Sequence, residues 1–334
     1  MSIQSGEISA AAGQSVFSAH AERVHSAIRG NGAARSALVA SWQRSARLHG
    51  LRPQDSGKPQ TITAQKLREV QEYVEPLTHL AQPVLDRLFL SVGGIGCCVL
   101  LADSDGVPVE RRGAVADDDI FHEWGLWIGA VWSEACEGTN GIGTCIVEQR
   151  AVTIHRDQHF HARNAGLSCS VAPIHDHLGR LIAVLDVSSC RSDLTEAYAG
   201  LIFAAVNDAA RKIETDYFRY QFQKARIVLA PVAEHNAGAL LAIDRDDMVI
   251  GASRSARVAL GLRDDGLKDP VPAADFFAAG CERDTDLAEA ERGVIVRALA
   301  RAEGKVSLAA KILGMSRATL HRKLNRLQIG RPQI

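Results

Sequence analysis

The stretch ERGVIVRALARAEGKVSLAAKILGMSRATLHRKLNRLQI, residues 291–329, predicts three consecutive helices and an all-α domain. In its first part, Val294, Ile295 and Leu299 recur at the spacing of one helical face, which predicts a helix over residues 288–301. Gly304 then interrupts the pattern, because glycine is the least favourable residue of a helix interior after proline.

The second and third helices are predicted from their caps and from the turn between them. Ser307 can cap the second helix and Ser316 the third, because a serine oxygen accepts a hydrogen bond from the first helical turn. Gly314 suits a left-handed turn between them, and Ala309 and Ala310 allow two crossing helices to approach closely. Two short helices joined by a turn that contains glycine are typical of a helix-turn-helix.

The third predicted helix carries hydrogen-bond donors on the face away from its leucines. Residues 289–334 hold ten Lys or Arg and three Glu, a net charge of +7, whereas the whole chain has −1, so residues 1–288 carry −8. A basic end on an acidic body favours DNA binding over a merely solvated helix face. We predict base contacts from Arg317, Thr319, His321, Arg322 and Asn325, phosphate contacts from Lys323 and Arg326, and a further contact from Ser316.

A specific run of residues connects this segment to a known family. Ala309-Ala310, Leu313-Gly314 and Ser316-Arg317-x-Thr319-Leu320-x-Arg322-Lys323-Leu324 resemble the Fis-type helix-turn-helix that ends many bacterial enhancer-binding activators. The resemblance implies that the third helix lies in the major groove of double-stranded DNA and that a homodimer reads two half-sites.

Composition limits the other functions of the chain. With 334 residues, of which 46% are hydrophobic, we expect two or three domains with cores of their own. The N-terminus lacks a basic start followed by an apolar run, and the longest apolar stretch, residues 89–102, is too short to cross a bilayer. We therefore expect a cytoplasmic protein that does not contact membranes.

Cysteines and histidines raise two chemical alternatives. Seven cysteines without a C-x-x-C pair argue against a disulfide framework or a zinc knuckle. Six residues are close enough in sequence to suggest a metal site: His155, His159, His161, Cys169, His175 and His177. Polar residues are normal in a loop and in a hairpin turn, which is the simpler explanation. We therefore expect neither metal nor cofactor.

The order of periodic segments predicts an α+β sensor region. Residues 1–20 are rich in Ser, Ala and Gly and are expected to be disordered, and residues 21–92 form a helical lead-in in which Thr63 can cap a long helix. Residues 93–226 contain strands in hairpins and a closing helix, which favours an antiparallel sheet with helices. The expected strands are 97–101, 107–111, 151–155, 168–174 and 180–188, and the closing helix is 193–222.

Motifs in this region resemble the GAF sensor domain of acetoin-catabolism-type, or AcoR-like, activators. They are Ser41-Trp42-x-Arg44-Ser45, Trp132-Ser133-Glu134-x-x-Glu137-Gly138-Thr139-Asn140-Gly141-Ile142-Gly143-Thr144, Phe160-x-x-x-Asn164-Ala165-Gly166-Leu167-x-Cys169-Ser170 and Leu185-Asp186-Val187-Ser188. The resemblance covers residues 35–225 and 288–329 and implies a pocket for a small effector, with acetoin or a related alcohol, aldehyde or ketone as the analogy. The candidate ligand-binding residues are Trp132, Cys136, Asn140, Cys145, His155 and Cys169.

The region between sensor and helix-turn-helix looks like part of a PAS domain. Residues 239–244 and 248–252 read as two strands and residues 255–262 as a helix. A full PAS domain is about twice as long, so we expect residues 233–280 to hold a truncated PAS-like segment and a linker, ahead of a Fis-type domain at 288–330.

One missing motif determines the expected mechanism. Full-length relatives carry a central AAA+ ATPase, which needs a G-x-x-x-x-G-K-[ST] phosphate loop, and the sequence has none. We expect a regulator, not an enzyme, that acts by recruitment, occlusion or competition, with RNA polymerase or a full-length activator as further partners. Two alternatives stay open: a thiol-based GAF enzyme or redox sensor, and a modulator that heterodimerises with a full-length activator. The effector, the target genes and the choice between activation and repression are also open.

Overall fold

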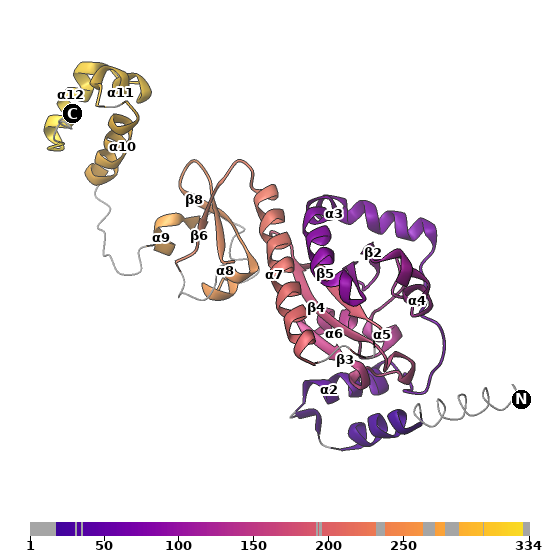
Figure 1. Cartoon of the computed structure of the whole chain (residues 1–334). Helices are drawn as coiled ribbons and strands as arrows, with labels where there is room; N and C mark the ends of the chain where they lie inside the picture. The colour runs from indigo at the N-terminus through magenta and orange to yellow at the C-terminus, as the bar shows by residue number, and fades with distance from the viewer. Residues whose placement is uncertain are drawn as a thin grey trace, which may run out of the picture. The chain divides into compact units, whose positions relative to one another are not determined.

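The computed structural model describes residues 18–30, 32–34, 36–191, 193, 196–231, 238–262, 271–277, 287–302 and 304–329. The chain divides into two compact units, Met1–Ala273 and Ala274–Ile334 (Figure 1). Of the expected disordered segment 1–20, residues 1–17 lie outside the described residues. For residues 18–20 the prediction of disorder is wrong, because they begin a helix over 18–29 whose Val24 and Ile28 are buried.

The first unit contains a five-stranded antiparallel sheet in the order β2-β1-β5-β4-β3. The predicted hairpin is formed by β4 and β5, and the α+β class with an antiparallel sheet is confirmed. The strands are β1 (Cys97–Asp103), β2 (Pro108–Arg112), β3 (Val152–His155), β4 (Ser168–His175) and β5 (Leu181–Ser189).

Two long helices, α3 (Ala64–Val92) and α7 (Glu196–Gln221), pack on one face of this sheet (Figure 1). Thr63 caps α3 as predicted, since its side chain accepts a hydrogen bond from the Lys66 N–H. Leu77 of α3 and Val206 of α7 are fully buried in the core shared with the strands. Burial of such apolar faces is the main source of stability of these helices.

The opposite face of the sheet is covered by short helices: α4 (Asp118–Glu123), α5 (Glu134–Glu137) and α6 (Gly141–Glu148). Phe121, Trp132 and Leu167 form the centre of this second core. The lead-in contributes the helix over 18–29, α2 (Ala37–Gln43) and a π-helical turn over Arg44–Leu48. The remaining turns are 3₁₀-helical and comprise Gly32–Ala34, Gly93–Ile95, Val115–Asp117, Arg156–Gln158 and Ala162–Asn164.

A second, four-stranded antiparallel sheet follows α7 in the order β6-β7-β8-β9. The sequence predicted β7 and β8 of this sheet and did not predict β6 and β9. The PAS-like assignment stays a prediction. The elements are β6 (Arg226–Leu229), β7 (Leu240–Ile243), β8 (Met248–Ala252), α8 (Arg254–Ala259), β9 (Val271–Pro272) and α9 (Ala273–Phe277).

The second unit contains the three predicted helices, α10 (Leu287–Arg301), α11 (Val306–Ile312) and α12 (Arg317–Arg326). Their core includes Ala309, Ala310, Leu320 and Leu324, all buried. In the described part of the chain, no helix is long and apolar enough to cross a membrane.

One predicted cap is wrong and the other is confirmed. Helix α11 begins one residue before Ser307, and its N-cap is Lys305, which makes no side-chain capping bond. Val306 packs against the core, which favours a helix that begins at this residue. Ser316 caps α12 as predicted by accepting a bond from the Thr319 N–H, and Gly314 is left-handed with φ of 62°.

Candidate functional site

One face of helix α12 is polar and does not pack against the core of the three-helix unit. Arg322 lies two residues from the buried Leu320 and Leu324, and therefore on the opposite side of a helix with 3.6 residues per turn. The side chains of Arg317, Arg322 and Asn325 are exposed, and those of Thr319, His321 and Lys323 are half-exposed. The helix N-terminus, the part of a recognition helix that reaches base edges, carries Arg317.

Two of the predicted phosphate contacts, Lys323 and Arg326, form ion pairs with Glu291 of α10. Glu291 is 22% exposed, and the hydrogen bond from Lys323 is the main reason that its pKa lies below the usual value. These pairs hold α12 against α10 and neutralise part of the charge of two cations. Arg317 and Arg322 have no carboxylate within ion-pairing distance in the described part of the chain, so their charge is fully available to DNA.

In the sensor, Arg44 and Glu134 join the lead-in to α5. Arg44 Nε donates to Glu134 Oε2 at 2.9 Å, and Arg44 Nη2 donates to Glu134 Oε1 at 3.2 Å and to Glu148 Oε1 at 2.8 Å. The Ser41 hydroxyl also donates to Glu134 Oε1 and lies 2.7 Å from the Thr139 hydroxyl. The Ser-Trp-x-Arg-Ser motif thus supplies polar groups that dock the lead-in onto α5, α6 and the connection between them.

The glycines of the motif at 138–144 have steric roles. Gly138 has φ of 60°, and a Cβ there would lie 2.7 Å from Phe160 Cβ. A Cβ on Gly141 would lie 2.6 Å from Cys169 Cβ, and one on Gly143 would lie 2.4 Å from the Glu134 backbone nitrogen. Only glycine allows these approaches. Asn140 caps α6 by accepting from the Gly143 N–H at 2.9 Å.

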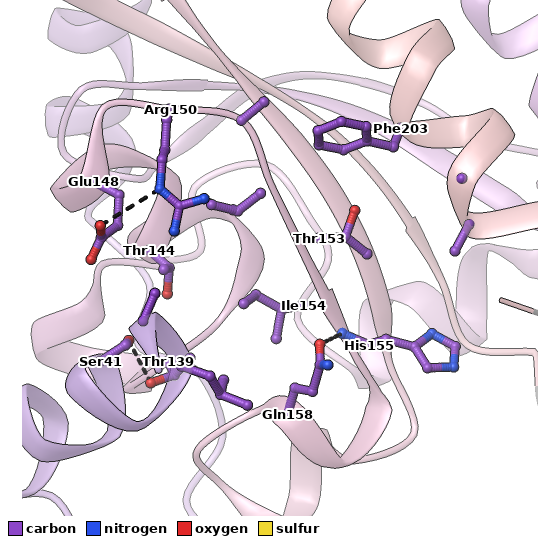
Figure 2. Close-up of a pocket in the computed structure, with 16 residues that line it drawn as sticks. Ser41, Thr139, Thr144, Glu148, Arg150, Thr153, Ile154, His155, Gln158 and Phe203 are labelled. Atoms are coloured by element: carbon purple, nitrogen blue, oxygen red, sulfur yellow. Dashed lines mark hydrogen bonds and ion pairs between the residues drawn. The ribbon is translucent and has the colours of Figure 1, made fainter. Parts of the chain in front are cut away.

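A cavity of about 530 Å³ lies beside β3, between α2, α6 and α7 (Figure 2). Its size is within the range of small-molecule sites. Figure 2 shows Thr153 of β3 facing Phe203 of α7, with Glu148 and Arg150 at one end and His155 with Gln158 at the other.

Of the six predicted ligand-binding residues, His155 lines this cavity. Trp132, Cys145 and Cys169 are buried in the core beneath α4 to α6, and the Trp132 indole donates to the Gly125 carbonyl at 2.8 Å. Asn140 is the helix cap described above, and Cys136 is half-buried with its sulfur 3.9 Å from Gln60 Oε1. The structure therefore does not bring the six together, and their role in ligand binding stays a prediction.

The cavity residues that the sequence did not predict come from distant segments. Ser41, Thr144 and Phe203 belong to three separate elements, and each contributes one short part of the wall. The Ser41 motif and the threonines of the 138–144 motif were visible in the sequence. No signal predicted that α7 would meet them.

Five of the six described cysteines have environments that disfavour thiol chemistry. Burial raises the pKa of the Cys97 thiol to about 11 and that of the Cys190 thiol to about 12. Burial also raises the pKa values of Cys98, Cys145 and Cys169 well above the usual range. A thiolate is the reactive form, and these environments disfavour it.

Two histidines of the segment 155–161 make hydrogen bonds to backbone carbonyls of the same domain. His159 Nδ1 lies 2.9 Å from the Arg156 carbonyl and His161 Nδ1 lies 3.1 Å from the Arg52 carbonyl. Burial lowers the pKa of both imidazoles to about 4, which keeps them neutral near pH 7. Among the described residues, no three His, Cys, Asp or Glu side chains are grouped so that they could hold a metal ion.

Asp186, in the centre of β5, is a buried carboxyl group with one unbonded oxygen. The Ser188 hydroxyl donates to its Oδ2 at 2.7 Å, and its Oδ1 has no hydrogen-bond partner within the described residues. Complete burial raises its pKa from the ordinary 3.8 to about 7. The neutral acid is therefore favoured in the folded sensor over most of the acidic range.

We expect Asp186 to make the sensor less stable as the pH rises. Because the folded-state pKa is raised, the contribution to stability is fully present below about pH 4 and is lost as the pH rises to about 7. Relative to Asp186→Asn, the wild type should lose about 1.4 kcal/mol of unfolding free energy per pH unit in that window. Urea denaturation of both proteins at pH 5 and pH 7 measures this difference. An equal pH dependence in the two proteins would contradict it.

Two family models match the chain. Residues 286–327 match the family described as "Bacterial regulatory protein, Fis family", so the C-terminal unit is the Fis-type helix-turn-helix of a bacterial regulatory protein. Residues 19–215, more than half of the 334, match the family described as "MimR, N-terminal domain". The chain belongs to the MimR N-terminal domain family.

Named relatives agree with this placement. The acetoin catabolism regulatory protein of Cupriavidus necator is 33% identical over 224 residues, which cover 66% of this chain and 34% of the relative. The propane 2-monooxygenase operon transcriptional activator MimR of Mycolicibacterium smegmatis is 28% identical over 235 residues, 69% of this chain and 38% of the relative. The predicted resemblance to AcoR-like regulators is confirmed. The chain spans about a third of the length of these two relatives.

A solved structure with a similar chain is the complex DhaR(N)-DhaL of E. coli. The match has 16% sequence identity and a TM-score of 0.49, and it covers 69% of this chain and 78% of that chain.

Proposed function

We propose that this chain is a sequence-specific DNA-binding transcriptional regulator. Its sensor domain would bind a small molecule and control a dimeric helix-turn-helix. The observation that carries the proposal is α12, whose exposed Arg317, Arg322 and Asn325 stand on the face opposite its buried leucines. Arginine and asparagine are the side chains that pair bidentately with guanine and adenine in the major groove.

The sensor half of the proposal is supported by the cavity beside β3 and by the names of the relatives. Those names refer to acetoin catabolism and to the propane 2-monooxygenase operon, and acetoin and propane are small organic molecules. We infer an effector of that size, such as acetoin or a related alcohol, aldehyde or ketone. The 334 residues hold no phosphate-loop motif, and the proposal includes action without ATP hydrolysis.

A homodimer is part of the proposal because a two-fold DNA site needs a two-fold protein. Leu287 and Val294 of α10 are seven residues apart and remain 83% and 46% exposed. On α7, Tyr198 and Leu201 are also exposed. These apolar residues are suited to contact a second copy.

Genome-wide occupancy of the tagged protein tests the proposal, with Arg322→Ala as the matched variant. Discrete peaks over an inverted repeat, lost in the variant, are the expected result, and the neighbouring genes would identify the regulated pathway. Diffuse occupancy that is equal in the two proteins would contradict sequence-specific binding by α12.

Lys323→Ala is expected to weaken DNA binding by about the same factor on every sequence. A free lysine that contacts a phosphate releases about one counterion, so the loss of Lys323, which is paired with Glu291, should reduce the slope of log affinity against log salt by at most about one unit. Titrations of operator and random DNA at several salt concentrations measure the slope. A change confined to one base position would mean that Lys323 reads a base instead.

A further inference from the structure

The cavity beside β3 has a free strand edge as one of its walls. β3 is the last strand of the sheet, and it pairs only with β4 in the described part of the chain. Arg156, which follows β3, donates its backbone N–H to the Leu167 carbonyl at 2.7 Å, on the β4 side. Backbone groups alternate in direction along an antiparallel strand, so those of Thr153 and the N–H of His155 point away from β4.

The side chain of Gln158 already occupies one position along this edge. Its Oε1 accepts the outward His155 N–H at 2.8 Å, as a neighbouring strand would (Figure 2). The outward N–H and C=O of Thr153, two residues earlier, have no partner within the described residues. They form an adjacent donor and acceptor where Thr153 lines the cavity, and the Thr153 side chain faces Phe203.

The polar side chains of the wall are bonded to one another. Ser41 pairs with Thr139, and the Thr153 hydroxyl lies 3.2 Å from the Ser170 hydroxyl. Glu148 accepts from Arg44 at 2.8 Å and lies 3.7 Å from Arg150.

These ionised groups also balance in charge. Glu148 and Arg150 line the cavity as one carboxylate and one cation, and Arg44 and Glu134 behind the wall form a second such pair. The cavity therefore has no excess charge with which to attract an ion, and burying an unpaired charge there would be costly.

We propose that this cavity binds a small, uncharged molecule with an adjacent hydrogen-bond donor and acceptor, held by the backbone N–H and C=O of Thr153. The apolar part of the ligand packs on Phe203 and on the open side of Gly200, where a Cβ would have no atom within 4 Å. This inference rests on the proposed function and gives the chemical class and the place of its effector. Residues of both α2 and α7 line the cavity. The ligand therefore contacts the lead-in and the helix at the end of the sensor at the same time.

The test uses the full chain and three four-carbon probes of similar size: butyramide, butyrate and butylammonium. Binding is measured by isothermal titration and by the shift in Tm. We expect butyramide to bind and both ions to bind at least about tenfold more weakly, because neither charge finds a partner. Tighter binding of either ion, or binding of none of the three, would overturn the proposal.

Two pairs of variants locate the site. Gly200→Phe fills the cavity and should reduce butyramide affinity by about tenfold or more, whereas Asp208→Phe, two helical turns further along α7 at an exposed position, should not. Thr153→Pro removes the outward N–H without removing a ladder bond, since proline is tolerated at such edge positions. Thr153→Val keeps that N–H and should retain binding. Full affinity in Gly200→Phe, or equal losses in the two Thr153 variants, would place the ligand elsewhere.

Operator binding by the same proteins separates this proposal from the proposed function. If the protein binds butyramide through Thr153 but binds no operator, the proposed ligand site is supported and the proposed regulatory function is contradicted. If the protein binds the operator but prefers either ion to butyramide, the proposed regulatory function is supported and the proposed site for an uncharged ligand is contradicted.

Discussion

Replacing Arg322 by alanine is expected to lower operator affinity by about 1–3 kcal/mol, roughly 5- to 150-fold, with little effect on random DNA beyond one phosphate-like contact. The guanidinium is exposed opposite the leucine face and has no carboxylate partner among the described residues. Its loss therefore removes base recognition without opening the core of the three-helix unit. The free energy of unfolding should change by less than about 0.5 kcal/mol, as for other surface substitutions.

Fluorescence anisotropy with a labelled operator and a scrambled duplex measures this effect, with thermal unfolding as the check on the fold. Arg297→Ala is the matched control, because Arg297 is an exposed arginine on α10 and not on α12. Its removal changes the net charge equally but should spare the ratio of operator to random affinity. Equal losses in the two variants would show that Arg322 contributes charge alone.

The helix-turn-helix could be predicted from sequence because its determinants are local. Ser316 caps the helix that begins at the next residue, and Gly314 adopts the positive φ that its turn requires. Leu320 and Leu324 face the core because they are one helical turn apart. The ion pairs of Glu291 with Lys323 and Arg326 could not be predicted in this way, since they join residues more than thirty positions apart.

The sensor sheet was similarly predictable, whereas its cavity was not. Residues 97–101 and the hairpin of β4 and β5 have the composition of buried strands. The cavity depends on how α2 and α7 pack beside the edge of β3, which is a tertiary arrangement without a local pattern. Asn140, a predicted ligand contact, caps α6 in the structure, and the motif residues Glu134 and Gly143 position neighbouring helices and backbone.

Arg44→Ala is expected to destabilise the sensor by about 3–5 kcal/mol, because it leaves the Glu134 carboxylate buried without its cation. The Glu134 side chain is only 2% exposed, and it accepts two of the three hydrogen bonds that Arg44 donates to carboxylates. The docking of α2 on α5 should weaken with it, so that the lead-in becomes more susceptible to proteolysis than the sheet. Chemical denaturation and limited proteolysis measure the two effects.

The chain contains a matched control for this prediction. Arg23 also joins the lead-in to the sensor, through Asp157 at 2.6 Å, but the two side chains are 49% and 58% exposed. Water screens such a pair, so Arg23→Ala should cost only about 0–1 kcal/mol. If the two arginine variants were equally stable, burial would not determine the strength of the Arg44 pair. If Arg44→Ala alone also weakened butyramide binding, the docking of α2 would be coupled to the cavity that α2 helps to line.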